Sequence, residues 1–211
     1  MAPNVAALVR LMLVTDDRLI AGRDLIAVAR RAEAGGATSV QLRLKEASPR
    51  EQVSLARALV AALRIPVLVN DRPDVALAAG AAGVHLGADD LPVELARAIV
   101  PEGFILGPSV GSAAEASAAA AADYWGIGPW RRTSTKADAG TGLGAEGFAA
   151  LVGLGGGRPC LAIGGVLPSD MDAILRAGGM GVAAATGILG SDDVQAATAS
   201  YVAALLRSPT A

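Results

Sequence analysis

Aromatic residues are scarce in this chain of 211 residues: Trp, Tyr and Phe together make up only 3% of it. The core must therefore be built from Ala, Val, Leu and Ile, which supply most of the 53% of hydrophobic residues. Charged residues make up 18%, so the composition is that of a globular chain and excludes a disordered one. The length suits one sizeable core and is short for two.

Cysteine and histidine are almost absent, since Cys160 and His85 are the only examples of each. A single cysteine forms no internal disulfide, so we expect a reducing compartment, the cytoplasm. Cys160 lies in the apolar run CLAI and is expected to pack as a strand residue. His85 stands at strand spacing between Val84 and Leu86, where either acid–base chemistry or a buried structural hydrogen bond fits.

A strong net charge and long apolar runs are also missing. The net charge of −2 gives no general attraction to nucleic acid, so a bound anion must be held by locally placed groups. The sequence has no uncharged apolar stretch of about 18 residues, so we expect no transmembrane helix. The early charges Asp16, Asp17 and Arg18 argue against a secretion signal. No nucleic-acid or membrane partner is expected, and a homo-oligomer is left open.

Short β-rich runs alternate with longer helical patterns along the chain. Eight strands are expected, at 11–14, 39–42, 67–69, 83–85, 104–106, 124–127, 161–163 and 181–184. Eight helices are expected, at 22–34, 49–63, 73–79, 92–100, 113–122, 145–154, 168–176 and 192–206. The glycine-containing phrases AGGA, AGAAG and AGGMG each precede a strand, where glycine supplies the left-handed cap of a helix.

Eight strand–helix units in about 200 residues match the lower size limit of a (βα)8 TIM barrel of the α/β class. An open doubly wound sheet is the alternative. It usually has fewer units and a glycine-rich first turn, which Thr15-Asp16-Asp17 does not provide. The sequence has no linker or break in composition, so we expect a single barrel domain over residues 1–211.

Function in this fold is found at the carboxyl ends of the strands, and a first group of polar residues follows strands 2 to 4. Alternation with period two puts Gln41, Arg43 and Lys45 on one side of the second strand and Leu42 and Leu44 on the other. Amide and cationic groups pointing into a barrel need an anionic partner that accepts hydrogen bonds. The alternative is a frayed strand end whose charges are solvated.

Carboxylates complete this first group. Asp71 follows strand 3, and Asp89 and Asp90 follow strand 4. Because these strands are neighbours, Asp71 can face one of the other two across a short distance. Two carboxylates beside cations suit magnesium carrying substrate phosphates. The alternative is that Asp71 caps the helix at 73 and that Asp89 or Asp90 caps the helix at 92; which of those two binds metal is left open.

A second polar group follows strands 6 to 8. The loop GPWRRTSTK, polar and flanked by glycine, is expected to be a lid. Hydroxyl, amide and ammonium groups of this kind can bind a phosphate, and phosphate sites are frequent after strands 7 and 8 of this fold. The residues are Thr133, Thr135, Lys136, Gly164, Gly165, Thr186 and Gly187. Two anion sites, one of them competent for metal, indicate a transferase with two substrates.

Taken together, these motifs resemble the thiamine phosphate synthase family. They are QLRLK at 41–45, NDR at 70–72, GVHLGADD at 83–90, GPS at 107–109, GPWRRTSTK at 128–136, AIGGV at 162–166 and AATGIL at 184–189. They occur in the family's order and spacing over nearly the whole chain. The resemblance implies a magnesium-dependent enzyme that joins hydroxymethylpyrimidine diphosphate to hydroxyethylthiazole phosphate and releases pyrophosphate.

The resemblance also implies roles for individual residues. The pyrimidine diphosphate would be held by Gln41, Arg43, Lys45, Asn70, Ser109 and Lys136. The thiazole phosphate would be held by Thr133, Thr135, Gly164, Gly165, Ala185 and Thr186, and magnesium by Asp71 and Asp90. Arg43, Lys45 and Lys136 would be catalytic, because they stabilise the pyrophosphate as it departs. No protein nucleophile is needed.

The sequence departs from the family pattern at four places. Leu44 replaces an acidic residue, Arg131-Arg132 replace an aromatic residue and a proline, Thr186-Gly187 replace serine and alanine, and Val110-Gly111 replace a histidine or threonine pair. Arg131 and Arg132 add charge beside the expected phosphate loop. They either tighten anion binding or cover the lid in solvent.

Two other functions are compatible with such a barrel. A thiazole tautomerase-like isomerase belongs to the same superfamily, but its catalytic histidine after strand 5 has no counterpart in Ser109-Val110-Gly111-Ser112. A non-catalytic regulatory barrel that binds a thiamine precursor or product is the second alternative, which the altered loop around Arg131 and Arg132 leaves open. A phosphoribosyl isomerase-type barrel is disfavoured, because paired metal-type aspartates have no role there.

Overall fold

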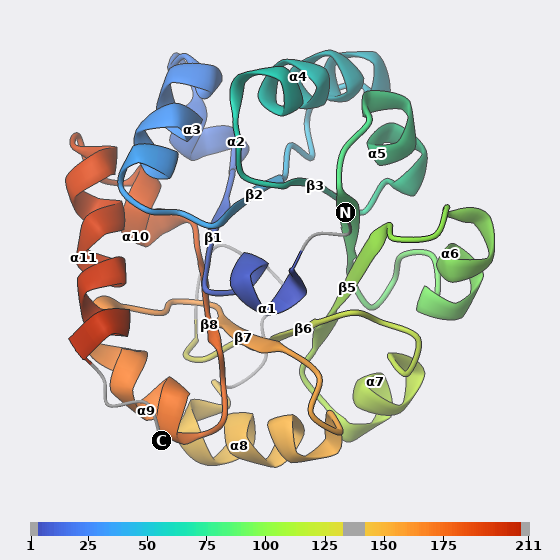
Figure 1. Cartoon of the computed structure of the whole chain (residues 1–211), viewed down its shortest axis with the longest axis vertical. Helices are drawn as coiled ribbons and strands as arrows, with labels where there is room; N and C mark the ends of the chain where they lie inside the picture. Colours follow the sequence, from blue (N-terminus) through green and yellow to red (C-terminus); the bar gives the residue numbers. More distant parts are fainter. Residues whose placement is uncertain (1–3, 133–141, 208–211) are drawn as a thin grey trace.

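The structure, a computed structural model, describes residues 4–132 and 142–207. Eight parallel strands pair in chain order, and the last returns to the first, so the sheet is a closed barrel (Figure 1). The strands are β1 (Leu11–Val14), β2 (Ser39–Leu42), β3 (Val67–Asn70), β4 (Gly83–Leu86), β5 (Ile105–Val110), β6 (Trp125–Ile127), β7 (Cys160–Ile163) and β8 (Gly181–Ala184). Closure confirms the predicted (βα)8 barrel and excludes the open doubly wound sheet.

Helices surround the barrel as an outer ring (Figure 1). They are α3 (Leu25–Ala34), α4 (Pro49–Ala62), α5 (Pro73–Ala79), α6 (Val93–Ile99), α7 (Ala113–Ala118), α8 (Gly144–Leu154), the 3-10 turn η1 (Pro168–Asp170) leading into α9 (Met171–Arg176), and α11 (Val194–Arg207). Each corresponds to a predicted helix, although α7 is shorter than expected. Within the described ranges, no helix has the length and apolar character needed to cross a membrane.

Three further helices have only four residues each: α1 (Val5–Leu8), α2 (Asp17–Ile20) and α10 (Thr186–Leu189). They are too short for a helical period to be recognised in the sequence, so they were not predicted. All three lie at the ends of strands, and two of them follow β1 and β8 at the end where the polar residues gather.

Local capping interactions decide where the main helices begin. The side chain of Asp24 accepts hydrogen bonds from two backbone N–H groups of the first turn of α3, so this helix starts at residue 25 and not at residue 22 as predicted. Ser48 and Glu51 form a capping box at the start of α4. Gly80 ends α5 in the left-handed conformation, with φ 70°, as the glycine-containing phrase indicates.

Two apolar layers make up the core. In β1, Leu13 packs in the outer layer between barrel and helices, whereas Met12 and Val14 belong to a separate cluster. Because strand residues alternate between the two faces, this second cluster fills the barrel lumen. Its strand members, with the adjacent Tyr124, are Met12, Val14, Leu68, Ile105, Tyr124, Leu161 and Ala183.

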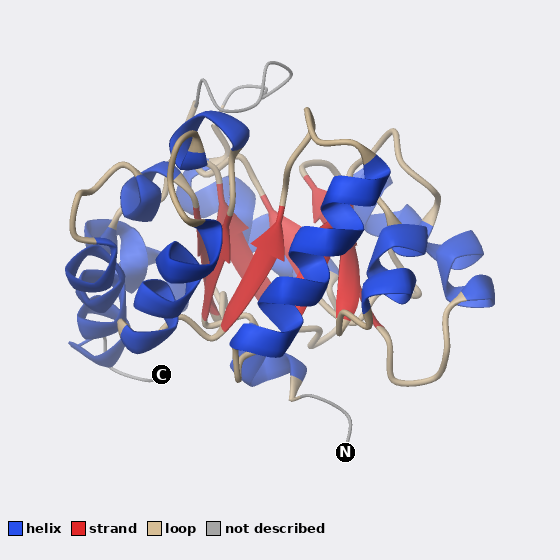
Figure 2. Ribbon diagram, turned by 90° about the horizontal axis from the view of Figure 1, so that it is seen from above, coloured by secondary structure: helices blue, strands red, loops and turns tan. Residues whose placement is uncertain are grey.

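The short helix α1 closes the amino end of the barrel. Leu8 and Val9 join the apolar cluster of the lumen, and Figure 2 shows α1 beneath the strands. The hydroxyls of Thr38 and Ser39 both donate to the carbonyl of Leu8 at 2.9 Å, which fixes this plug to β2. Among the described residues, α1 therefore closes the amino end of the lumen, so we expect a ligand to approach from the carboxyl ends of the strands.

Gly107 is the clearest packing constraint in β5. A Cβ atom there would overlap the ring of Tyr124, which is fully buried. We expect Gly107→Ala to lower the free energy of unfolding by at least about 2 kcal/mol, measured by urea denaturation. Gly153 of α8 is the matched control, because an added Cβ meets no atom within 4 Å; Gly153→Ala should stabilise by about 0.5–1 kcal/mol. Equal effects of the two substitutions would contradict this packing.

Candidate active site

The turn after β1 holds the end of β2. The hydroxyl of Thr15 accepts from the N–H of Arg43 at 2.7 Å and donates to the carbonyl of Arg43 at 3.1 Å. The Arg43 guanidinium lies 3.4 Å from the carboxylate of Asp16. Asp17 accepts from the N–H of Lys45 at 2.9 Å. These three residues of the turn position both cations, a role that sequence reasoning missed.

Leu42 and Leu44 point away from the lumen, as the period-two alternation predicts. Both are buried in the outer layer beneath the helices. Gln41 points the other way, where its amide lies 3.4 Å from the sulfur of Met12 in the lumen. The departure from the family pattern at Leu44 therefore lies in the helix-facing core. It is away from the mouth of the barrel, the opening at the carboxyl ends of the strands.

Asp71 has an unusual backbone conformation directly after β3. Its φ of 64° is the only positive value among the described non-glycine residues, and such conformations concentrate at functional sites. Its N–H donates to the carbonyl of His85 at 2.7 Å, and its carboxylate lies 3.6 Å from the Lys45 ammonium. The ends of β3 and β4, and the segment after β2 that carries Lys45, thus meet at Asp71.

The carboxylates of Asp71 and Asp90 face each other. Burial, and then hydrogen bonding and charge repulsion from Asp90, raise the pKa of Asp71 to about 6, although the Lys45 ammonium lowers it. Asp90 is fixed by the N–H of Gly87, which donates to it at 2.5 Å. Asp89 is exposed. The structure therefore brings Asp90, and not Asp89, to Asp71.

Helix capping does not explain these carboxylates. The cap residue of α5 is Arg72 and that of α6 is Pro92, and neither helix has a side-chain hydrogen bond at its start. The capping alternative is therefore wrong for Asp71, Asp89 and Asp90. No cluster of three or more His, Cys, Asp or Glu side chains suited to metal occurs in residues 4–132 and 142–207. The pair could hold a hard divalent cation whose other ligands are phosphate oxygens and water.

His85 lies in a buried hydrogen-bonded chain within the lumen. Its Nδ1 is 3.0 Å from the hydroxyl of Tyr124, and its Nε2 is 3.1 Å from the hydroxyl of Ser109. His85 is only 4% exposed, so the interpretation as a buried, hydrogen-bonded histidine is confirmed. Tyr124 was not predicted to contribute to the site. Asn70 is the register partner of His85 on β3.

The β6 loop packs over the two glycines that follow β7. A Cβ on Gly164 would lie 2.7 Å from the Cβ of Pro129, and one on Gly165 would lie 2.7 Å from Cγ of Arg131. The N–H of Trp130 donates to the carbonyl of Ile163 at 2.7 Å. The absence of a side chain at Gly164 and Gly165 therefore lets the β6 loop pack closely. The sequence had suggested a different reason, the approach of a ligand to their backbone amides.

Arg131 clamps that loop onto the β7 side. Its guanidinium forms a two-pronged ion pair with Asp170, at 2.8 and 2.6 Å, and donates to the carbonyl of Gly165 at 2.7 Å. Asp170 also accepts from the N–H of Leu167 at 2.7 Å. Three hydrogen bonds of the Arg131 guanidinium are therefore made to protein groups, a role in holding the loop that was not predicted. Its expected part in anion binding or solvent cover stays a prediction. Arg132 is exposed.

Asp170→Asn should loosen this clamp. We expect a loss of about 1–3 kcal/mol in the free energy of unfolding, because the substitution weakens charge-assisted hydrogen bonds to Arg131. Asp172→Asn is the matched control, since its ion pair with Arg176 lies one turn apart on an exposed helix face and should contribute at most about 0.5 kcal/mol. Urea denaturation of both variants gives the comparison. An Asp170 variant as stable as the control would show that the clamp is not stabilising.

The remaining predicted phosphate ligands are only partly within the described chain. Thr133, Thr135 and Lys136, and with them most of the expected lid, lie outside the described residues. Ala185 precedes α10, and Thr186 is its exposed first residue. Two departures from the family pattern have a packing explanation. An added Cβ on Gly187 would overlap the Tyr201 hydroxyl, and Val110 is buried in the outer core.

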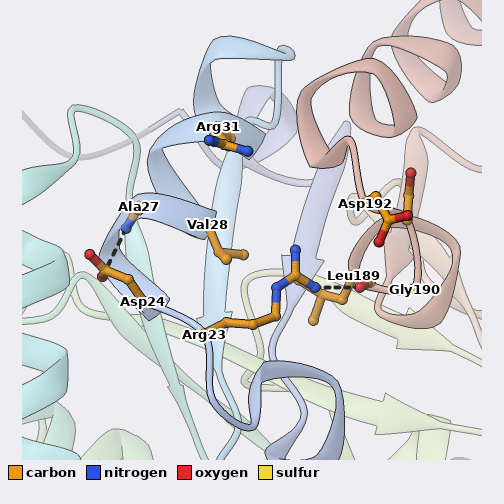
Figure 3. Close-up of a pocket in the computed structure, with 9 residues that line it drawn as sticks. Arg23, Asp24, Ala27, Val28, Arg31, Leu189, Gly190 and Asp192 are labelled. Carbon is orange, nitrogen blue, oxygen red and sulfur yellow. Dashed lines mark hydrogen bonds between the residues drawn. The ribbon is translucent and has the colours of Figure 1, made fainter.

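A separate pocket of about 480 Å³ lies between α3 and the turn that joins α10 to α11 (Figure 3). Its charged lining residues include Arg23, Arg31 and Asp192, and Arg23 donates to the carbonyl of Leu189 at 2.6 Å. None of the predicted site residues lines it. This pocket belongs to the outer helix ring and is distinct from the mouth where Arg43, Lys45, Asp71 and Asp90 meet.

Known proteins are similar to this chain in both sequence and fold. The family model described as thiamine monophosphate synthase matches residues 11–188. A thiamine-phosphate synthase of Azorhizobium caulinodans is 47% identical over 192 residues, which cover 87% of this chain and 89% of the relative. That of Xanthobacter autotrophicus is 46% identical over 201 residues, which cover 93% and 95%.

Solved structures agree with the sequence relatives. Thiamine phosphate pyrophosphorylase from Pyrococcus furiosus superposes with a TM-score of 0.86 at 34% identity, covering 96% of this chain and 98% of that one. A 3-hexulose-6-phosphate synthase superposes with a TM-score of 0.69 at 18% identity, and this likeness shows the fold alone. The matched range contains every strand and the four residues that meet at the mouth. The chain belongs to the thiamine monophosphate synthase family.

Proposed function

We propose that this enzyme joins hydroxymethylpyrimidine diphosphate to hydroxyethylthiazole phosphate, giving thiamine phosphate and pyrophosphate. Membership of the family supports this reaction and favours neither a thiazole tautomerase nor a regulatory barrel. The observation that carries the proposal is the meeting of Arg43, Lys45, Asp71 and Asp90 at one end of the barrel. Cations beside a carboxylate pair suit a diphosphate leaving group.

The reaction exchanges one bond for another at the pyrimidine methylene carbon. The carbon–oxygen bond breaks, and its electron pair leaves with pyrophosphate. The thiazole nitrogen then donates its lone pair to that carbon to form the carbon–nitrogen bond. The electron-rich aminopyrimidine tolerates positive charge on the carbon, so a dissociative path needs no protein nucleophile. Cys160 fits this, because burial raises its pKa to about 11 and keeps the thiol protonated.

Arg43 and Lys45 stabilise the leaving group in this scheme. Negative charge grows on pyrophosphate as the bond breaks, and preorganised cations lower the energy of that state. Asp16 orients the Arg43 guanidinium, while the backbone of Lys45 is fixed by Asp17. Lys136 is the third cation proposed for this role.

Magnesium is proposed to be held by Asp71 and Asp90. The donor set fits, because two hard carboxylate oxygens face each other beside a cationic anion site and repel each other without a cation between them. When bound, magnesium supplies positive charge to pyrophosphate oxygens. The chain's part is to hold both carboxylates in place, through the His85 carbonyl at the Asp71 N–H and the Gly87 N–H at Asp90.

The other predicted ligands divide between the two substrates. Those proposed for the pyrimidine side are Gln41, Asn70 and Ser109, which come from β2, β3 and β5. Those proposed for the thiazole phosphate are Thr133, Thr135, Gly164, Gly165, Ala185 and Thr186. The cytoplasmic location, the lack of a nucleic-acid partner and a single domain over residues 1–211 stay predictions, and a homo-oligomeric state stays open.

Stabilisation by magnesium should depend on pH. In the metal-free protein the raised pKa of Asp71 stabilises the fold most below the unfolded value of 3.8, and that contribution is lost as the pH rises through about 6. Metal binding needs the ionised carboxyl and has the opposite dependence. We expect the rise in melting temperature caused by magnesium and pyrophosphate to shrink as the pH falls below about 6. A rise that stays constant from about pH 8 to about pH 5 would contradict the assignment of Asp71.

The direct test of the reaction is incubation with both substrates and magnesium. We expect pyrophosphate and thiamine phosphate to form in equal amounts, and neither to form when one substrate is omitted. Isomerisation of a thiazole carboxylate phosphate without any diphosphate would indicate the tautomerase alternative. Binding of both substrates without turnover would indicate the regulatory barrel.

A further inference from the structure

Hydrogen bonds link Tyr124, His85 and Ser109 in series, from the buried lumen to the mouth of the barrel. Tyr124 is completely buried and His85 nearly so, whereas Ser109 is partly exposed. Two glycines make room for the side chains of Tyr124 and His85. Gly107 admits the Tyr124 ring, and a Cβ on Gly126 would lie 2.9 Å from Cε1 of His85. The lumen is therefore shaped around these three side chains.

The direction of the first hydrogen bond follows from the burial of Tyr124. Burial, and then the charge of Asp123, raise the pKa of the Tyr124 phenol far above its usual range, so the hydroxyl keeps its proton. In the described chain its one hydrogen-bond partner is Nδ1 of His85. If it accepted from Nδ1, its own O–H would be buried without an acceptor, which is unfavourable. Tyr124 therefore donates to Nδ1.

The tautomer of His85 follows from that direction. A neutral imidazole whose Nδ1 accepts a hydrogen bond carries its proton on Nε2. Nε2 then donates to the hydroxyl oxygen of Ser109 at 3.1 Å. The Ser109 oxygen is thus used as an acceptor towards the lumen, and its own O–H is directed elsewhere.

We propose that Tyr124 and His85 are positioning residues that fix Ser109 as a hydrogen-bond donor to an acceptor atom of the pyrimidine diphosphate at the mouth. The identity of this ligand rests on the proposed function, whereas the direction of the hydrogen bonds from Tyr124 through His85 to Ser109 does not. Ser109 lies on β5, one strand away from β4, whose end carries Asp90. A donor at this position selects for a substrate that offers an acceptor there.

The polarity can be measured in the ligand-free protein. Because His85 is the only histidine, protein labelled with 15N at histidine gives the signals of one imidazole. We expect wild type to show protonated Nε2 and unprotonated Nδ1. Tyr124→Phe, which removes only the hydroxyl, should shift the tautomer towards Nδ1–H or a mixture. Tyr201→Phe is the matched control, since that buried hydroxyl donates to the carbonyl of Val166 and should leave the tautomer unchanged.

Kinetics test the consequence for the ligand. We expect Tyr124→Phe to lower kcat/KM for the pyrimidine diphosphate about tenfold, the effect of one misdirected hydrogen bond, and to leave KM for the thiazole phosphate unchanged. Ser109→Ala should lower kcat/KM at least as much while His85 keeps the Nε2–H tautomer, because Tyr124 sets it. A purely structural role would instead affect both substrates.

Two results would overturn this inference. Protonated Nδ1 in wild type would reverse the polarity, whatever the protein catalyses, and this measurement needs no variant to fold. Unchanged tautomer and unchanged kinetics in a folded Tyr124→Phe protein would show that Tyr124 does not position Ser109. If His85 had the expected tautomer but the protein had no synthase activity, the proposed function would be refuted. The direction of the hydrogen bonds through His85 would still be supported.

Discussion

Asp71→Asn should lower kcat/KM of the magnesium-dependent reaction by about a thousandfold. The amide cannot supply the negative charge that holds a divalent cation against Asp90. Asparagine tolerates the left-handed backbone found at this position, so the fold should survive. Without metal the variant should even melt at a slightly higher temperature near neutral pH, because the substitution removes the burial of a charged carboxylate and the repulsion from Asp90, which raise the pKa of Asp71.

Asp89→Asn is the control for this substitution. Asp89 is the exposed neighbour of Asp90, so its variant should keep wild-type activity and the wild-type magnesium requirement. Steady-state kinetics over a range of magnesium concentrations, with thermal denaturation in EDTA, give both readouts. Full magnesium-dependent activity in Asp71→Asn, or an equal loss in Asp89→Asn, would refute the metal assignment.

Arg43→Ala should lower kcat by about a hundredfold to a thousandfold. The guanidinium is positioned by Asp16 and largely buried, with 15% of its side chain exposed, so solvent cannot replace its charge. Its effect is expected on the bond-breaking step, where pyrophosphate gains charge. Single-turnover rates of pyrophosphate release measure that step, and calorimetry of magnesium pyrophosphate binding measures the affinity for the product.

Arg72→Ala is the matched control for Arg43. Arg72 lies near the same end of the barrel but is paired with its neighbour Asp74 and is more exposed. Removing it should change kcat less than about threefold, since exposed pairs contribute little. If both arginine variants lost activity equally, a general loss of positive charge would explain the result better than a specific contact of Arg43.

The fold could be predicted closely because local rules agree with it. Strands β1, β2 and β8 have the expected bounds, since apolar β-rich runs between helix caps leave little choice there. At the start of α3 a side-chain contact decided the difference: Asp24 starts this helix three residues later than predicted. The helix α1 could not be foreseen, because it is stabilised by the packing of Val5 and Leu8 against the barrel.

The candidate site could be predicted to the extent that it follows from strand ends. Chain order alone places Arg43 and Lys45 beside Asp71 and Asp90, because neighbouring parallel strands end at the same edge. Contacts between distant segments could not be predicted. The pair of Arg131 and Asp170 spans 39 residues, and no local pattern links them.

Tyr124 was missed for a related reason. It precedes β6 in an apolar run and looks like an ordinary core residue, and only the barrel brings its hydroxyl to His85, again 39 residues away. The one available signal is the glycine at position 107. Its lumen-facing place in β5 is explained only once the ring that fills the space is known.

A crystal structure grown with magnesium and pyrophosphate tests the convergence at the mouth most directly. We expect the metal between the carboxylates of Asp71 and Asp90, with pyrophosphate oxygens in contact with Arg43 and Lys45. Metal bound away from the two aspartates, or pyrophosphate bound only in the pocket beside Arg23 and out of reach of Arg43, would contradict the proposed site.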